Sequence, residues 1–225
     1  MRISPDPAVL TAALLLALTP AAEARTCPPA TPNPPETRVS LSTGISTPIY
    51  SGELNLRQIA ALAGNPALGR GSFITGLTRS TTSVVITPQL WELDMGGGRR
   101  CVGLGRVEAT WRLERILVNI ASEYPPGACN YRIIREHEDE HVAIARKTFQ
   151  DWAPRMEKAL AEATRTMGPS VMAAPAATVA RQTTDRLMQA LRPVLAAYEA
   201  DLNRRDGAID TEVNYRRLNR LCPTW

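Results

Sequence analysis

The sequence predicts an α+β fold, in which a small mixed or antiparallel sheet in the N-terminal half precedes a long helical hairpin. Two observations predict it. Up to residue 121, apolar and polar residues alternate in short stretches bounded by glycine, proline, serine and threonine, as in strands. After Pro125-Pro126-Gly127 the apolar period changes from two to 3.6, as in helices. A run of strands followed by a run of helices is typical of the α+β class.

The predicted strands are short. Alternation in residues 107–111 and again in residues 116–120 indicates an antiparallel hairpin that turns through residues 112–115. One helix interrupts the strands at residues 56–63, with Asn55 as its cap. The predicted strands cover residues 38–42, 83–87, 90–94, 101–111 and 116–121.

Two long helices are expected in the C-terminal half. The first follows Gly127 and ends near residue 167, where a glycine–proline pair and an alanine- and proline-rich stretch break it. The second spans roughly residues 178–205, and Pro154 and Pro193 are the expected kinks. A short last helix begins at Asp210 or Thr211 and runs toward residue 221.

The N-terminus has the form of a secretory signal peptide. A basic residue precedes an apolar run of about 11 residues, too short to span a bilayer, and small residues close the segment at Ala22-Glu23-Ala24. We expect residues 1–24 to be removed, residues 25–36 to form a proline-rich arm and residues 37–225 to form one domain. With no second hydrophobic segment to act as an anchor, a periplasmic or secreted bacterial protein is predicted.

The expected mature chain is basic. Removing the signal peptide leaves 25 basic and 20 acidic residues, and Lys147 and Lys158 are the only lysines. Arginines cluster at residues 204–205, 216–217 and 220. Because no recognised nucleic-acid module accompanies them, a solvated helix face is the preferred interpretation and no nucleic-acid partner is expected.

All four cysteines lie in the exported part, and an even number in an oxidising compartment favours two disulfides. Of the three pairings we expect Cys101 with Cys129 and Cys27 with Cys222, because the second would tie the ends of the domain together. A zinc site of four cysteines is the alternative, but the chain has no C-x-x-C spacing to support it.

Both histidines of the chain lie in the stretch REHEDEHVAIARK, residues 135–147. On a helix His137 and His141 lie one turn apart and point about 40° apart, so they could share one metal ion. They occupy the apolar stripe of that helix and are therefore expected to face inward. Imidazole suits Zn²⁺, so this spacing predicts a zinc site; a pair of buried histidines on an acidic helix is the alternative.

The stretch fits two peptidase patterns at once. His137-Glu138-x-x-His141 is the H-E-x-x-H motif, and His137-x-x-Glu140-His141 is its inverted form. A zinc-bound water becomes acidic, and a carboxylate beside it can accept its proton. Both glutamates lie about 80° from the midline of the histidines, so helix geometry does not choose between them. We expect Glu138 to be the base because the forward motif is commoner.

The third metal ligand must be a carboxylate, a thiolate or water, since no other histidine exists. If the two long helices form an antiparallel hairpin, the histidines lie level with about residues 204–208 of the returning helix. The carboxylates within reach are then Glu199, Asp201, Asp206 and Asp210, and the sequence singles out none of them.

Three segments resemble uncharacterised bacterial exported proteins of the predicted secreted zinc-dependent protease type, a group of unknown function that carries an H-E-x-x-H helix after a cysteine. The segments are GACNYRIIREHEDEHVAIARK at residues 127–147, Gly76-Leu77-Thr78, and GAIDTEVNYRRLNRLC at residues 207–222. The resemblance implies that His137 and His141 are metal ligands, that Glu138 is the catalytic base and that Cys129 is a structural cysteine.

These features together predict a secreted zinc metallopeptidase, with a peptide or protein substrate in the cell envelope and Glu138 as general base. The alternative is a non-catalytic periplasmic or envelope binding protein, in which the two histidines hold a structural or vestigial metal site, or no metal at all.

Overall fold

A computed structural model describes residue 27 and residues 36–64, 74–172 and 174–225. The expected signal peptide and most of the proline-rich arm lie outside the described residues. The remaining chain is α+β, as the sequence predicts, with a sheet in the N-terminal half and long helices after it. The order of elements is β1 (Arg38–Ile45), β2 (Ile49–Ser51), α1 (Leu56–Leu62), β3 (Gly76–Asp94), β4 (Arg100–Ile120), α2 (Cys129–Arg165), β5 (Ser170–Met172), α3 (Ala176–Ile209) and α4 (Glu212–Leu218).

The sheet is organised around β4. On one side β3 pairs with β4 antiparallel along its whole length. On the other side β5, β1 and β2 pair with successive parts of β4, the first antiparallel and the other two parallel. In the described part of the chain, therefore, the outer edge of β3 is unpaired.

The predicted hairpin at residues 112–115 is wrong, because β4 is one continuous strand of 21 residues. Thr81 lies opposite Arg115 and Thr82 opposite Leu113, so Glu114 is an extra residue that forms a β-bulge. The bulge shifts the alternation by one residue and keeps Leu113 and Ile116 both buried. The predicted strands at residues 83–87 and 90–94 likewise merge into β3. The hairpin turn is instead at residues 95–99, where Gly96, Gly97 and Gly98 adopt positive φ.

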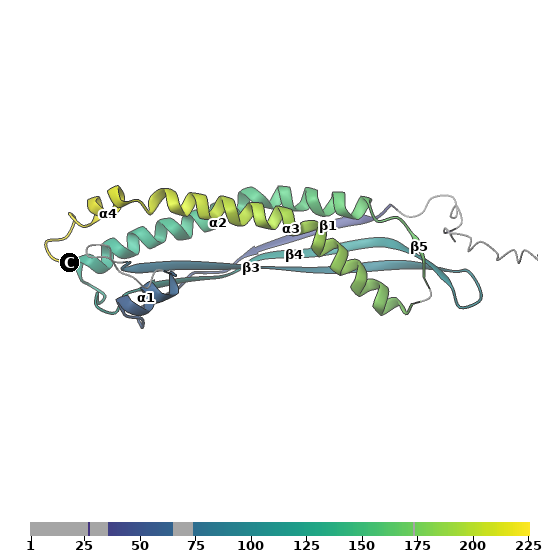
Figure 1. Ribbon diagram of the computed structural model, residues 1–225, viewed down its shortest axis with the longest axis horizontal. Coiled ribbons are helices and arrows are strands. Elements are labelled where there is room, and N and C mark those ends of the chain that lie inside the picture. Colours follow the sequence, from purple (N-terminus) through teal and green to yellow (C-terminus); the bar gives the residue numbers. More distant parts are fainter. Residues whose placement is uncertain (1–26, 28–35, 65–73, 173) are drawn as a thin grey trace, which may run out of the picture.

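The helices agree closely with the sequence prediction. Asn55 caps α1 and Thr211 caps α4. Helix α2 continues through Pro154, and helix α3 continues through Pro193. Figure 1 shows α2 and α3 side by side along one face of the sheet and α1 near one end of it, and α3 changes direction along its length.

An aromatic cluster sets how the helices lie on the sheet. The ring of Trp111 on β4 lies 4.2 Å from that of Phe149 on α2 and 5.2 Å from that of Tyr198 on α3. All three side chains are almost fully buried. They anchor the antiparallel register of the helices, in which each step back along α2 is matched by an equal step forward along α3. His141, eight residues before Phe149, thus faces Asp206, eight residues after Tyr198.

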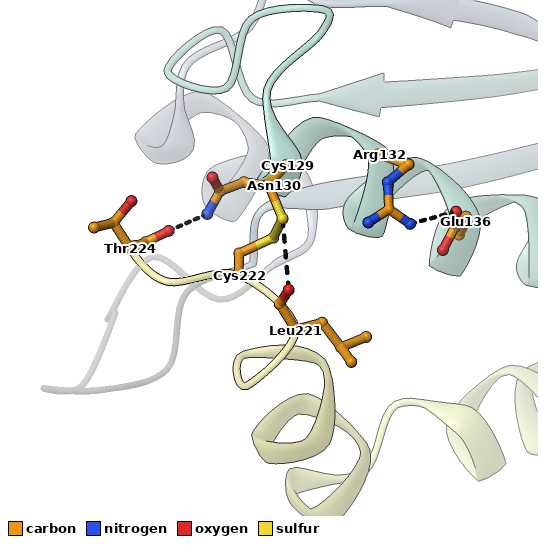
Figure 2. The surroundings of a disulfide bond; sticks show 7 residues. All are labelled: Cys129, Asn130, Arg132, Glu136, Leu221, Cys222 and Thr224. Atoms are coloured by element: carbon orange, nitrogen blue, oxygen red, sulfur yellow. Dashed lines mark hydrogen bonds and ion pairs between the residues drawn. A yellow bond between two sulfur atoms is a disulfide. The ribbon is translucent and has the colours of Figure 1, made fainter.

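The expected disulfide pairing is wrong. The structure pairs Cys27 with Cys101 and Cys129 with Cys222. Cys101 is the second residue of β4 and Cys129 follows the other end of this strand, and at about 3.3 Å per residue the two ends of β4 are some 60 Å apart. Because α3 returns along α2, it brings the C-terminal segment back to the first residue of α2 (Figure 2).

Two disulfides fit a protein of an oxidising compartment. No helix in the described part of the chain is long and apolar enough to cross a membrane.

Candidate metal centre

The two histidines face inward from α2, as their place in the apolar stripe predicts. His137 is 6% exposed and His141 8% exposed. Their rings lie 4.8 Å apart, with Nε2 of each directed at the same point between α2 and the end of α3. A helix that turns about 100° per residue places both on the face that packs against α3 and the sheet.

Asp210, the C-cap residue of α3, meets both histidines. Its Oδ1 lies 3.0 Å from Nε2 of His137 and 3.0 Å from Nε2 of His141. The three candidate ligand atoms lie within 4.8 Å of one another. Imidazole nitrogen and carboxylate oxygen are common ligands of divalent metal ions, so His137, His141 and Asp210 could hold one.

Asp206 orients one of the histidines from behind. Its Oδ1 lies 2.9 Å from Nδ1 of His141, so Nδ1 donates its proton to Asp206, and Nε2 is the nitrogen that a metal ion could bind once its own proton is displaced. A carboxylate on the outer nitrogen of a ligand histidine fixes its tautomer in many metal sites. Nδ1 of His137 is buried and has no hydrogen-bond partner in the described part of the chain, so packing against His141 and Tyr215 orients that ring.

The charges at the centre favour a cation. Burial lowers the pKa of His141, but hydrogen bonds to Asp206 and Asp210 outweigh burial and raise this pKa to about 10. Burial raises the pKa of Asp210, but hydrogen bonds from both histidines and Tyr215 hold it well below its usual range. An unprotonated Nε2 of His141 and the Asp210 carboxylate would repel each other at 3.0 Å, and a proton or a metal ion at this point removes the repulsion.

Glu138 is buried beneath this cluster and is 4% exposed. Thr78 on β3 donates a hydrogen bond of 2.7 Å to Oε2 of Glu138, and the carboxylate also packs against Gly76. Burial raises the pKa of the Glu138 carboxyl, and the Thr78 hydrogen bond and the nearby histidines lower it in part. Glu140, the rival base in the inverted motif, is exposed to solvent.

Tyr215 closes the cluster from α4. Its hydroxyl donates a hydrogen bond of 2.7 Å to Oδ1 of Asp210, and its ring lies 5.5 Å from the ring of His137. Burial and the hydrogen bond to Asp210 raise the pKa of Tyr215 above its usual range. No residue of α4 is itself fully buried, so α4 depends on these contacts and on the nearby disulfide for its position.

Of the four carboxylates within predicted reach, Asp206 and Asp210 lie at the centre. The other two do not: Asp201 is bonded to Trp152 and Arg205, and Glu199 is exposed. The helices face each other two residues further along α3 than the predicted level, since His141 meets Asp206 and His137 meets Asp210.

Sequence reasoning assigned no role to Gly76, Thr78 and Tyr215. All three lie in the segments that carry the resemblance described above, and that clustering is the one signal that could have found them. The spacing of residues along the chain could not have identified them, because β3 and α4 are far from the histidines in the sequence.

Comparisons with protein-family models, with curated proteins and with solved structures found no match.

Proposed function

We propose that this protein is a zinc-dependent peptide hydrolase in which His137, His141 and Asp210 are the metal ligands. One observation carries the proposal: two imidazole nitrogens and a carboxylate oxygen converge within 4.8 Å, next to a buried glutamate. This donor set, two histidines and one carboxylate with a fourth position for water, is that of many catalytic zinc sites. Bound zinc would polarise a peptide carbonyl and acidify the water beside it.

Each neighbouring side chain then has a chemical task. Glu138 would accept a proton from the attacking water and pass it to the leaving amine, and burial raises the pKa of its carboxyl, which favours the exchange of a proton. Thr78 holds the Glu138 carboxylate in place through its hydrogen bond. Asp206 would hold the Nδ1 proton of His141 and so orient its Nε2 toward the metal ion.

The proposed substrate is a peptide or protein in the envelope or outside the cell. Support comes from the two disulfides, which fit an oxidising compartment, and from the expected signal peptide.

The test is metal content measured together with peptide hydrolysis. Purified chain is expected to hold about one zinc, lost on His137→Ala, His141→Ala or Asp210→Ala. Glu138→Gln should retain zinc and lose hydrolysis. Glu140→Gln is the matched control: it makes the same change two residues away, at an exposed position, and should leave both unchanged. Zinc-replete protein that cleaves nothing in a broad peptide library would instead support a non-catalytic metal-binding protein.

A further inference from the structure

The outer edge of β3 borders the candidate metal centre. Thr78 on this strand donates to Glu138, and Gly76 packs against it. Among the described residues no strand pairs with this edge, so backbone N–H and C=O groups of β3 face outward there. An unpaired edge of this kind can accept an extended peptide as an additional strand.

A groove of about 430 Å³ lies beside residues 78–81 of β3, and Arg115 and Leu117 of the neighbouring strand β4 also line it. Four consecutive residues of β3, from Thr78 to Thr81, form one wall, and Leu202, Asn203 and Asp206 of α3 contribute the opposite wall. Asp206 is also the partner of His141, so the groove borders the candidate metal centre. Its volume is within the range of sites that bind small ligands and peptide side chains.

Two arginines give the groove a positive side. Thr78 is opposite the buried Val118 and so faces the helices, which places Arg79 on the other face of the sheet. Arg115 is opposite Thr81 on that same face, diagonal to Arg79. Both arginines line the groove, are exposed and form no ion pair with any residue that the structure describes.

We infer that the β3 edge at residues 78–81 binds an extended, acidic peptide segment as an added strand. The inference rests on the proposed function, for which it names the substrate class. Side chains of an added strand alternate between the two faces of the sheet. One set meets α3 and the metal centre, and the other set meets Arg79 directly and Arg115 across β3. Acidic residues at every second position of the peptide satisfy both arginines.

The test measures binding rather than cleavage. The protein is the chain carrying Glu138→Gln, and the probes are two labelled eight-residue peptides, one alternating threonine with glutamate and one alternating threonine with lysine. Fluorescence anisotropy should show the glutamate peptide binding at least about tenfold more tightly than the lysine peptide. Arg79→Glu combined with Arg115→Glu should remove or reverse that preference. Arg99→Glu, the same change in the distant β3–β4 turn, should leave it intact.

Hydrogen exchange decides where the peptide lies. Bound glutamate peptide should slow exchange of the outward-facing amides at residues 78–81 and leave those near residue 90 unchanged. Equal binding of the two peptides, or binding without this protection, overturns the inference.

The outcomes for peptide binding and for hydrolysis distinguish the inference from the proposed function. If the parent protein holds no zinc and cleaves no peptide but the binding and the amide protection persist, the hydrolase proposal fails and the peptide-binding edge stands. If the chain cleaves peptides with no preference for acidic ones, the edge inference fails alone.

Discussion

Gly76→Ala should disable the proposed catalytic base without changing any functional group. Gly76 lies on β3 with its α-carbon against the buried side chain of Glu138. A Cβ at this position would lie 2.8 Å from both Cγ and Cδ of Glu138, and closer still to Oε1. Ordinary contacts of a Cβ begin at 3.4 Å. Glycine is therefore required at residue 76 because the Glu138 side chain approaches the backbone closely, and not because the chain turns there.

The size of the effect follows from these distances. To restore ordinary contact distances from a Cβ at residue 76, the Glu138 side chain must move by at least about 0.6 Å and its carboxylate tip by on the order of 1 Å. A misplacement of about 1 Å at a reacting group lowers the rate roughly 10²-fold. The hydrogen bond from Thr78 is lost or lengthened by the same movement. None of the three metal ligands lies on β3, and the nearest atoms to a Cβ at residue 76 all belong to the Glu138 side chain, so the geometry of the ligands should not change.

The assay is steady-state hydrolysis of a peptide substrate, with zinc content measured on the same samples. Gly76→Ala should lower kcat about 100-fold and keep about one zinc per chain. Gly52→Ala is the control, because a Cβ there meets only a backbone oxygen at 3.9 Å. Activity within threefold of the parent protein would refute the placement of Glu138 as the base, and loss of zinc would show that the change disturbs the metal ligands instead.

Three further outcomes are expected. Asp206→Asn should weaken zinc binding by about 10- to 100-fold in a chelator competition, whereas Asp201→Asn, the same change on α3 away from the centre, should not; equal effects would contradict the orienting role. Replacing Cys129 and Cys222 with alanine opens a loop of 93 residues and should cost about 4–5 kcal/mol by the loop-entropy relation, read from chemical denaturation; a change below 1 kcal/mol would contradict it. Gly207→Ala, in the last turns of α3 with open space around it, should raise the free energy of unfolding by ~0.5–1 kcal/mol, and a lower melting temperature would show a contact missing from this description.

Helical periodicity identified the parts of the site that are local. His137 and His141 share a face because they are one turn apart, and their place in the apolar stripe predicted their burial. The approximate level of the returning helix also followed from counting residues across the connection, which brought both Asp206 and Asp210 into the candidate set.

Strand topology was harder to predict. A β-bulge at Glu114 changes the alternation of β4 by one residue, and in the sequence this change looks like the end of one strand and the start of another. Two strands and a turn were therefore predicted where one long strand exists. The disulfide pairing failed for a related reason, since the length of β4 separates Cys101 from Cys129.

The sequence by itself determined the fold class, the helix that carries the candidate metal site and the inward direction of its histidines, because helical periodicity acts over one or two turns. It left two glutamates as rival bases and four carboxylates as rival ligands. Only the tertiary structure separated them: Glu138 is buried against Gly76 and Thr78 while Glu140 is exposed, and Asp210 meets both histidines. Those distinctions depend on the packing of β3, α3 and α4 around α2, which involves contacts between residues 60 or more positions apart.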